Sequence, residues 1–405
     1  MTRKNKNRIK NLSIYVILLV IAYFMLFPFT YMVTSSLKKP ADIYRFPPRL
    51  LPKDQETIDI EGLGEDLPLY YPLIDGVENN EPYALVKKNI PTGIYADPKN
   101  PDVTYEKFTS DVQPRGGFFS DQETIVFNGE EVGLWNVDVN GVIVSMIQLS
   151  KTSVGKLVNP SDLSDIVYTN VRLTKKVEKI SAHPENYSEV FKLQGLYRAL
   201  TNTFLVTILV VIGQLLTSIM GGYAFARLKF PGRDKLFLLY LGSYMIPFVV
   251  LTIPLYQVMQ VLGWANTTTA LIVPWVFTVY GTFLMKQSFL TIPMEVEEAA
   301  LIDGASRWLM LRKIFIPGIM PAIATLATFS FLYAWNSFLW PLIILKIGSD
   351  NTVLTLALQE LQGRAADKVH LILAAATITI LPPVLVFIAM QKHYLKSIMA
   401  SGVKG

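Results

Sequence analysis

One charged segment interrupts the apolar second half of the chain. It runs from Met294 to Pro317 as MEVEEAALIDGASRWLMLRKIFIP and carries four acids, three bases and one glycine. The chain has no cysteine and only three scattered histidines, His183, His370 and His393. It also contains neither a GxxxxGK[ST] loop nor a GxGxxG turn, so neither thiolate chemistry nor a nucleotide-binding core is indicated. The charged segment is therefore a candidate for contact with a partner or a membrane surface, not for catalysis.

The composition is that of a membrane protein. Of 405 residues, 51% are hydrophobic and 17% are charged, and the mean hydropathy is +0.36, whereas soluble chains carry about 25% charged residues. Six apolar segments reach the roughly 20 residues that a spanning helix needs. They are Leu12–Val33, Ala199–Ala226, Leu236–Leu262, Thr267–Met285, Ile314–Leu345 and Leu371–Met390.

Basic residues predict the orientation of these helices. The N-terminal RKNKNRIK, the ARLKFPGRDK loop, the charged segment and the tail QKHYLKSIMASGVKG would all lie on one side. The positive-inside rule makes that side cytoplasmic, together with both chain ends. A signal peptide is the alternative for the first apolar segment, but that segment exceeds the usual apolar region of about 7–15 residues and lacks a clear cleavage site. We therefore expect a retained helix.

An acidic region separates the first two apolar segments. From Lys53 to Ile180 there are 12 Lys and Arg residues against 21 Asp and Glu, a net charge of −9, whereas the remainder carries 25 against 11, a net charge of +14. The second half of this region predicts a meander of three strands joined at Asn128-Gly129 and Asn140-Gly141, because Asn-Gly suits type I′ turns. DIVYTNVRLTKKVEKI offers a fourth strand. The first half, rich in Pro, Tyr and acids, predicts loops, and no catalytic triad or metal cluster is visible.

The expected fold is thus an all-α polytopic membrane protein with six transmembrane helices and a β-rich extracytoplasmic insert between helices 1 and 2. The expected divisions are residues 1–52, 53–182 and 183–405. The insert is interpreted as a docking or spacer domain rather than an enzyme.

The centres of the six apolar segments hold no ionisable residue, which disfavours an ion relay inside the membrane. Softer polar residues are present, namely Asn202, Gln214, Gln257, Gln260 and Asn336. Hydrogen bonding between helices is one interpretation, worth about 1 kcal/mol each. Lining a path for a neutral, hydroxyl-rich solute is the other, for which Asn202, Gln214, Gln257 and Asn336 are the candidates.

The charged segment predicts two short helices joined by a turn. Pro293 ends the preceding helix, and the glutamates after it favour a helix N-terminus. Gly304 supplies a turn that a Cβ would hinder, and a second helix carries Arg307, Arg312 and Lys313 back into the membrane. An ordinary amphipathic interfacial loop remains an alternative on these grounds.

The spacing in this segment resembles the EAA motif of permease subunits in binding-protein-dependent ABC importers. The matching residues are Glu298, Ala299, Ala300, Asp303, Gly304, Ile314 and Pro317, with Ile316 in place of the common Leu. SLKKPADIYRFPPRLLP, HPENYSEVF, AWNSFLWPL and the closing YLKSIMASGVKG resemble the carbohydrate-uptake branch, in particular the second permease of maltose-type importers. The resemblance covers nearly the whole chain except the insert.

The resemblance implies a coupling helix, at about residues 293–317, that docks into an ATPase subunit. Glu298 would engage the ATPase, Ala299 and Ala300 would allow close packing, and Ser401–Gly405 would reach the same interface. It also implies a heterodimer with a homologous permease, two ATPase subunits that use ATP and Mg, and an extracytoplasmic solute-binding protein for a sugar, oligosaccharide or polyol. This chain would bind no cofactor or metal, no nucleic acid, and would not be an enzyme. An ion-coupled secondary transporter and a membrane-anchored receptor are the alternatives.

Overall fold

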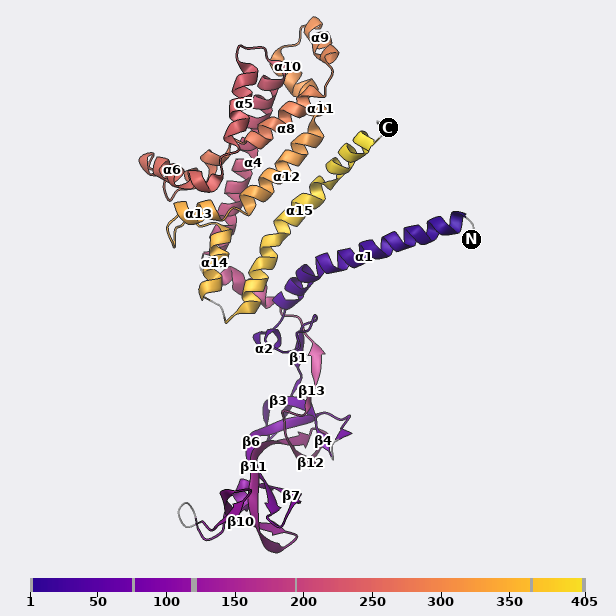
Figure 1. Ribbon diagram of the computed structural model, residues 1–405, viewed down its shortest axis with the longest axis vertical. Coiled ribbons are helices and arrows are strands. Elements are labelled where there is room, and N and C mark those ends of the chain that lie inside the picture. Colours follow the sequence, from indigo (N-terminus) through magenta and orange to yellow (C-terminus); the bar gives the residue numbers. More distant parts are fainter. Residues whose placement is uncertain (1–2, 75–76, 118–121, 194, 365–366, 403–405) are drawn as a thin grey trace. The chain divides into compact units, whose positions relative to one another are not determined.

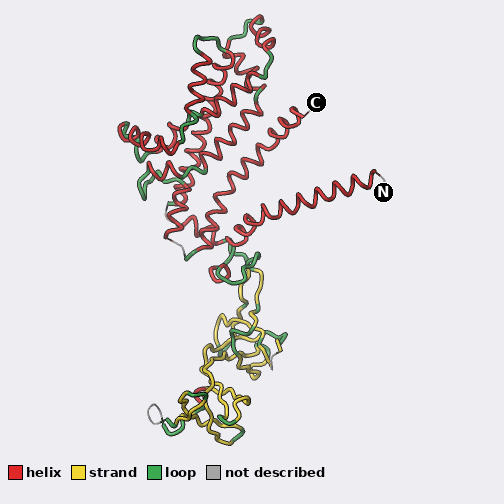
Figure 2. The backbone as a smooth tube through the Cα atoms, in the orientation of Figure 1, coloured by secondary structure: helices red, strands yellow, loops and turns green. Residues whose placement is uncertain are grey.

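The computed structural model describes the backbone of residues 3–74, 77–117, 122–193, 195–364 and 367–402. The chain divides into two compact units, one formed by Met1–Pro52 with Ala182–Gly405 and the other by Lys53–Ser181. Figure 2 shows that the first unit is helical and that the second is built from strands. We call them the helical unit and the insert.

The helical unit contains long apolar helices joined by short ones (Figure 1). The helices are α1 (Arg3–Ser36), α2 (Pro40–Ile43), α3 (Glu185–Lys192), α4 (Leu196–Arg227), α5 (Arg233–Ser243), α6 (Phe248–Val261), α7 (Thr268–Ile272), α8 (Val279–Leu290), α9 (Met294–Ile302), α10 (Arg307–Met310), α11 (Ile316–Gly318), α12 (Met320–Trp335), α13 (Leu339–Ile344), α14 (Leu354–Arg364) and α15 (Val369–Gly402).

Among the described residues, five stretches are long and apolar enough to cross a membrane, and a sixth is counted if the bent pair α5 and α6 forms one span. The apolar segment predicted over Leu236–Leu262 forms two helices, because α5 and α6 meet at 96°. Pro247 stands at this break and has no N–H with which to continue a helix. The expected start of the fifth span at Ile314 is too early, since the spanning stretch begins at Met320.

The loops of the helical unit gather at two ends. At one end, Arg227 of α4 donates hydrogen bonds to the carbonyl oxygens of Phe289 and Ile292, near the end of α8. At the other end, the backbone N–H of Asn266 donates to the carbonyl oxygen of Ile344 at 3.0 Å. The loops after α4 and α8 therefore share one end, and those after α6 and α13 share the other, as repeated membrane crossing requires.

Helices α4 and α8 pack closely at a glycine. A Cβ built on Gly222 would lie 2.5 Å from the Cβ of Met285 and 2.9 Å from the backbone nitrogen of Lys286. Small residues let helix backbones approach in membranes, where van der Waals packing supplies much of the association energy. Gly222 is therefore a packing residue of this helix pair.

The helical unit holds its own chain together where the insert enters and leaves. The side-chain amide of Asn186 donates to the carbonyl oxygens of Ser36 at 2.8 Å and Lys38 at 3.0 Å. The backbone N–H of His183 donates to the carbonyl oxygen of Leu37 at 2.9 Å. All five residues belong to the helical unit, so the insert is not needed to make these bonds.

The insert is an antiparallel β structure. Its strands are β1 (Lys53–Gln55), β2 (Thr57–Ile60), β3 (Gly64–Tyr71), β4 (Leu73–Ile74), β5 (Val77–Glu78), β6 (Tyr83–Asp97), β7 (Asn100–Phe108), β8 (Gln113–Pro114), β9 (Thr124–Phe127), β10 (Glu130–Val139), β11 (Val142–Asn159), β12 (Asp162–Thr169), β13 (Lys175–Lys176) and β14 (Glu178–Ile180). The largest sheet has the order β13-β3-β6-β11-β10-β8.

The prediction that the first half of the insert is a loop is wrong. Strands β1 to β8 all lie there, and β6 pairs with β11 from Ala84 opposite Val158 to Ala96 opposite Ile147. The prolines of this half obscured apolar runs that become strands by pairing with a partner distant in sequence. Burial against that partner outweighs local composition, as β propensity depends strongly on context.

The two Asn-Gly turns are confirmed. Asn128 and Gly129 have φ of 51° and 89°, and Asn140 and Gly141 have φ of 56° and 86°. The first pair joins β9 to β10, and the second joins β10 to β11. Positive φ at both central residues is the requirement of a type I′ turn. The fourth strand is also confirmed as β12, which pairs with β11.

We expect Gly222→Ala to lower the free energy of unfolding of the purified protein by about 1–3 kcal/mol, because the backbone of α8 would have to move away. Gly242→Ala in α5 is the matched control, since a Cβ there meets nothing within 4 Å. The control should be neutral or slightly stabilising. Equal unfolding temperatures of the two variants in detergent would contradict this account of the α4–α8 contact.

Candidate functional site

The charged segment begins with α9, which ends in a glycine turn. Gly304 has a φ of +76°. Its backbone N–H donates to the carbonyl oxygen of Leu301 at 3.0 Å, and that of Ala305 donates to the carbonyl oxygen of Ala300 at 2.9 Å. These two bonds form a Schellman motif, in which a residue with positive φ closes the helix. The expected role of Gly304 in shaping the turn is consistent with this geometry.

The two faces of α9 have different surroundings. Glu297 and Ala300, three residues apart, are buried against the rest of the helical unit. Glu295, Glu298 and Ala299 are exposed on the other side, and so is Ile302, of which 86% is accessible. Helical spacing thus turns one stripe inward and leaves another free. Ala300 packs against this chain's own core. Of the two alanines of the motif, only Ala299 is accessible to another protein.

The second part of the charged segment returns towards the membrane. The hydroxyl of Ser306 caps α10 by accepting from the backbone N–H of Leu309 at 3.2 Å. A π-helical turn, Leu311–Phe315, then leads to α11. Within it Phe315 is fully buried and Ile314 is half-buried.

The remaining motif residues of this part lie at the surface. Pro317, in the first turn of α11, and Asp303, which ends α9, are both exposed. Trp308 is 65% exposed. An exposed tryptophan and the exposed Ile302 in one short segment are typical of a surface that contacts another protein.

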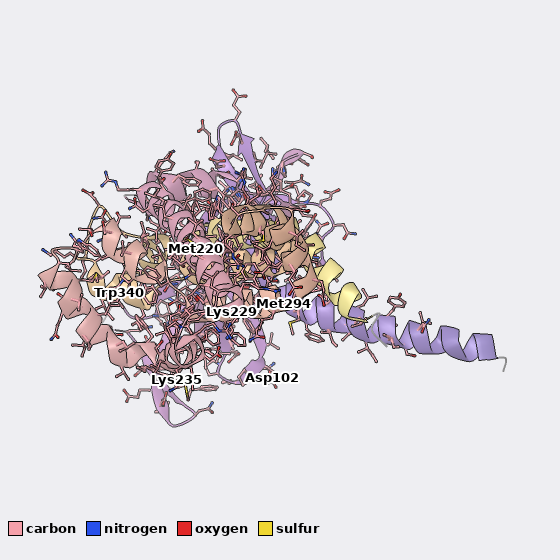
Figure 3. The ribbon with its side chains drawn as sticks, turned by 90° about the horizontal axis from the view of Figure 1, so that it is seen from above. Asp102, Met220, Lys229, Lys235, Met294 and Trp340 are labelled. Carbon is pink, nitrogen blue, oxygen red and sulfur yellow. The ribbon has the colours of Figure 1, made fainter. Side chains whose placement is uncertain are left out.

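A buried ion-pair network attaches the charged segment to α4. The Arg227 side chain is 2% exposed and the Glu297 side chain is 6% exposed. Arg227 Nη1 lies 3.5 Å from Glu297 Oε2 and 2.9 Å from the sulfur of Met294, which Figure 3 labels. Glu297 Oε1 also accepts from Arg307 of α10. One carboxylate therefore joins three helices: α4, α9 and α10.

The charges in this network are compensated. Burial alone would lower the pKa of Arg307, but its hydrogen bonds and the attraction of the Glu297 carboxylate outweigh that effect and raise the pKa above its usual value. Nη2 of Arg227 donates to the carbonyl oxygens of Phe289 and Ile292, while its buried Nε has no hydrogen-bond partner among the described residues. Its guanidinium carbon also lies 5.1 Å from the centre of the Phe315 ring. Buried charges are tolerated when they are paired and hydrogen-bonded in this way.

The sequence analysis missed the roles of Arg227 and Glu297. It selected Glu298, which the structure leaves exposed. A usable signal was present, because Arg227 directly follows a long apolar run and is the first cation after it. A cation at that point on the helix needs either solvent or an acid nearby, and the acidic start of the charged segment provides one.

Most polar residues of the spans make hydrogen bonds within the chain. The Asn202 amide donates to the carbonyl oxygens of Asp350 and Thr352. Gln214 donates to the carbonyl oxygen of Trp275 at 2.8 Å and accepts from the hydroxyl of Ser330 at 2.5 Å.

The side-chain amides of the remaining three polar residues have different surroundings. Asn336 donates to the carbonyl oxygen of Leu332 in its own helix, and Gln260 donates to the hydroxyl of Tyr256. Gln257 is exposed on α6. Hydrogen bonds within the helical unit are therefore made by four of these amides, those of Asn202, Gln214, Asn336 and Gln260.

Comparison with known proteins decides the family. A sequence profile of the family "Binding-protein-dependent transport system inner membrane component" matches residues 213–399. The Arabinooligosaccharides transport system permease protein AraQ of Halalkalibacterium halodurans is 36% identical over 222 residues, which cover 55% of this chain and 79% of that protein. The chain belongs to this family of inner membrane transport components.

Other members of the family resemble this permease to a similar extent. The sn-glycerol-3-phosphate transport system permease protein UgpE of Rhizobium meliloti is 34% identical over 224 residues, covering 53% of this chain and 79% of that protein. The osmoprotective compounds uptake permease protein GgtD of Synechocystis sp. is 32% identical and covers 54% and 74%. A solved bacterial ABC transporter that imports the acidic polysaccharide alginate superposes with a TM-score of 0.48 at 21% identity, covering 53% and 81%.

The family assigns a coarse function. The chain is the permease component of an ABC importer, a multi-pass inner membrane protein and a transport subunit rather than an enzyme. The matched range contains the whole charged segment. No group of three or more possible metal ligands occurs among the described residues.

Glu297→Gln and Glu298→Gln should separate attachment of the charged segment from its exposed face. We expect Glu297→Gln to loosen the segment, because it leaves Arg227 buried with a neutral partner; breaking such a pair costs about 3–5 kcal/mol. Hydrogen exchange of residues 294–317 measures the effect. Glu298→Gln should leave the exchange of this range unchanged. Equal exchange in both variants would contradict the proposed attachment.

Proposed function

We propose that this permease forms half of a pathway for a hydroxyl-rich solute, a sugar, an oligosaccharide or a related polyol. The supporting observation is the substrate chemistry named for its relatives, which includes arabinooligosaccharides, sn-glycerol-3-phosphate and alpha-glucosides. All of these carry several hydroxyl groups. The absence of ionisable residues from the centres of the spans fits a neutral path better than an ion relay.

The energy for transport comes, in this proposal, from other subunits. A homologous permease completes the pathway, two ATPase subunits bind ATP and Mg on the cytoplasmic side, and an extracytoplasmic binding protein delivers the solute. Both ends of this chain lie in the cytoplasm. The nucleotide-binding loop missing from the sequence is then supplied by the partners.

The exposed stripe of α9 is the proposed docking surface for an ATPase subunit. Glu298 and Ala299 lie on it, and Ile302 provides apolar area. The buried Glu297 and the ion pairs around it fix the orientation of this stripe relative to α4. A push on α9 would therefore move α4 and α8 together. Ser401–Gly405 is proposed to reach the same ATPase interface. Residues 403–405 of this stretch lie outside the described residues.

Hydrogen bonds within the chain leave fewer polar residues of the spans as candidates for lining the pathway. Asn202, Gln214 and Asn336 already use amide groups inside the chain. Gln257, on the helix that follows the 96° bend, retains the best opportunity to face a solute. The partner permease would provide the remaining contacts.

The insert is proposed to orient or retain the binding protein. The first and last strands of the insert run side by side, with Lys53 opposite Ile180. The helical unit bonds Asn186 and His183 to the end of α1 with its own groups. The insert is thus an addition to the outer loop rather than a part of the helix packing.

Glu298→Lys and Gly304→Pro should abolish coupling while the protein still inserts. Reversal of charge at Glu298 would repel a cationic docking partner, and proline at Gly304 can neither adopt a φ of +76° nor donate to Leu301. We expect uptake of the substrate to fall at least roughly tenfold, equivalent to about 1.4 kcal/mol, with less ATPase copurifying. Glu131→Lys, on an exposed site of the insert, is the control. Normal uptake in both variants would refute the coupling assignment.

Deletion of Lys53–Ala182 with a short linker should leave the assembled permease intact, because Asn186 and His183 still hold the ends of the deletion. Docking of the binding protein should weaken. The measurements are the affinity of the purified complex for its binding protein and the yield of complex. Unchanged affinity and uptake would remove the docking role of the insert.

A further inference from the structure

The insert contains a polar cavity of about 180 Å³ that opens at its surface, where Lys88 and Arg172 are exposed. It lies beside the middle of the long β6–β11 pair and under the connection from β12 to β13. The lining residues are Tyr70, Lys88, Asn89, Ser153, Val154, Asn170, Val171 and Arg172. Two of them are cations and none is an acid, although the insert as a whole carries more acids than bases.

A β-bulge builds one wall of this cavity. On β11, Lys156 pairs with Lys87 and Val154 pairs with Ile90, so Gly155 alone faces two residues of β6, Lys88 and Asn89. Asn89 has a φ of 55°, the left-handed conformation. Bulges turn side chains away from the regular alternation of a strand and are often found at functional sites. Here the bulge brings Lys88 and Asn89 to the cavity.

The loop after β12 builds the opposite wall. The side-chain oxygen of Asn170 accepts from the backbone N–H of Arg172 at 3.1 Å. This bond occupies the acceptor of Asn170 and leaves its NH₂ group as the group that can serve a ligand. Tyr70 is buried beneath, packed with Tyr83 and Leu157. The donors therefore come from β6, from β11 and from the loop after β12.

The charges around the bulge lack acidic partners. Among the residues that the structure describes, neither Lys88 nor Arg172 forms an ion pair, whereas Lys175 of the same insert reaches Glu78 at 3.1 Å. Lys87 stands directly opposite Lys156 across the strand pair, and like charges in this position repel. In a region with a net charge of −9, such a concentration of cations favours a bound anion.

We propose that this cavity binds an oxyanion, a carboxylate or a phosphate, free or attached to a small hydroxylated molecule. Lys88 and Arg172 would bind its charge, and Asn170 and Ser153 would donate to its oxygens or to neighbouring hydroxyls. The volume is below the roughly 300–1,000 Å³ of a site for a whole drug-sized ligand, so it suits one charged group or one sugar acid. This site goes beyond the proposed role of the permease and does not depend on it.

The test is hydrogen exchange of the full-length permease in nanodiscs with sodium phosphate, sodium glucuronate or glucose at constant ionic strength. We expect phosphate or glucuronate to slow exchange in residues 86–92 and 152–156, and glucose to have no effect. In Lys88→Gln/Arg172→Gln the concentration needed should rise at least roughly tenfold, because both charged hydrogen-bond donors to the anion are removed. Lys99→Gln/Lys107→Gln, two cations outside the cavity, is the matched control.

The outcomes separate the sources of the anion. Protection by phosphate alone identifies a free oxyanion, and stronger protection by glucuronate identifies a sugar acid; both support the site. Exchange of β10 without added anion verifies that each variant is folded. No protection in the wild-type protein, equal protection by glucose, or unchanged affinity in Lys88→Gln/Arg172→Gln would overturn the proposal.

Discussion

The buried guanidinium of Arg227 is the group on which the end of the helical unit that carries the charged segment depends. It stands at the last turn of α4 and contacts the end of α8, the start of α9 and the Phe315 ring. A charge in that position is stable only while its partners stay in place, since an unpaired buried charge is expensive. The carboxylate of Glu297, itself shared with Arg307, is the partner that the charged segment supplies. The segment is therefore fixed to the spanning helices rather than loosely attached.

Rigidity at this point has a mechanical consequence for an importer. The charged segment has an apolar underside, with Ala300, Met310 and Phe315 in one core with Tyr223 and Phe289 of the spanning helices. Apolar packing resists compression but does not specify direction, whereas the ion pairs are directional. Together they allow a displacement of the exposed stripe to be transmitted to α4 and α8. The small residue at Gly222 lets α8 approach α4 closely.

Local chemistry decided which features could be predicted from the sequence. The two Asn-Gly turns, the apolar spans and the glycine turn at Gly304 depend on residues within a few positions of one another, and these predictions agree with the structure. Three other features could not be predicted from neighbouring residues. They are the strands in the first half of the insert, the 96° bend between α5 and α6, and the burial of Glu297 rather than Glu298. The strands and the burial of Glu297 depend on partner segments distant in sequence, whereas the bend stands at Pro247 and only its size of 96° is not evident from the local residues. Two adjacent glutamates have the same propensities, and only the position of Arg227 distinguishes them.

The charge division of the chain has a similar physical basis. The insert has its own apolar clusters, one around Leu67 and Ala84 and another around Tyr95 and Val137. It therefore needs no apolar contact with the helices in order to fold, and its surface is free to be acidic. The helical unit in turn closes the loop between α1 and α3 with Asn186 and His183. Because each unit has apolar clusters of its own, about 130 residues can stand in one loop of a membrane protein and still form a separate core. The insert can then acquire a binding function, such as an anion site, independently of the transport machinery.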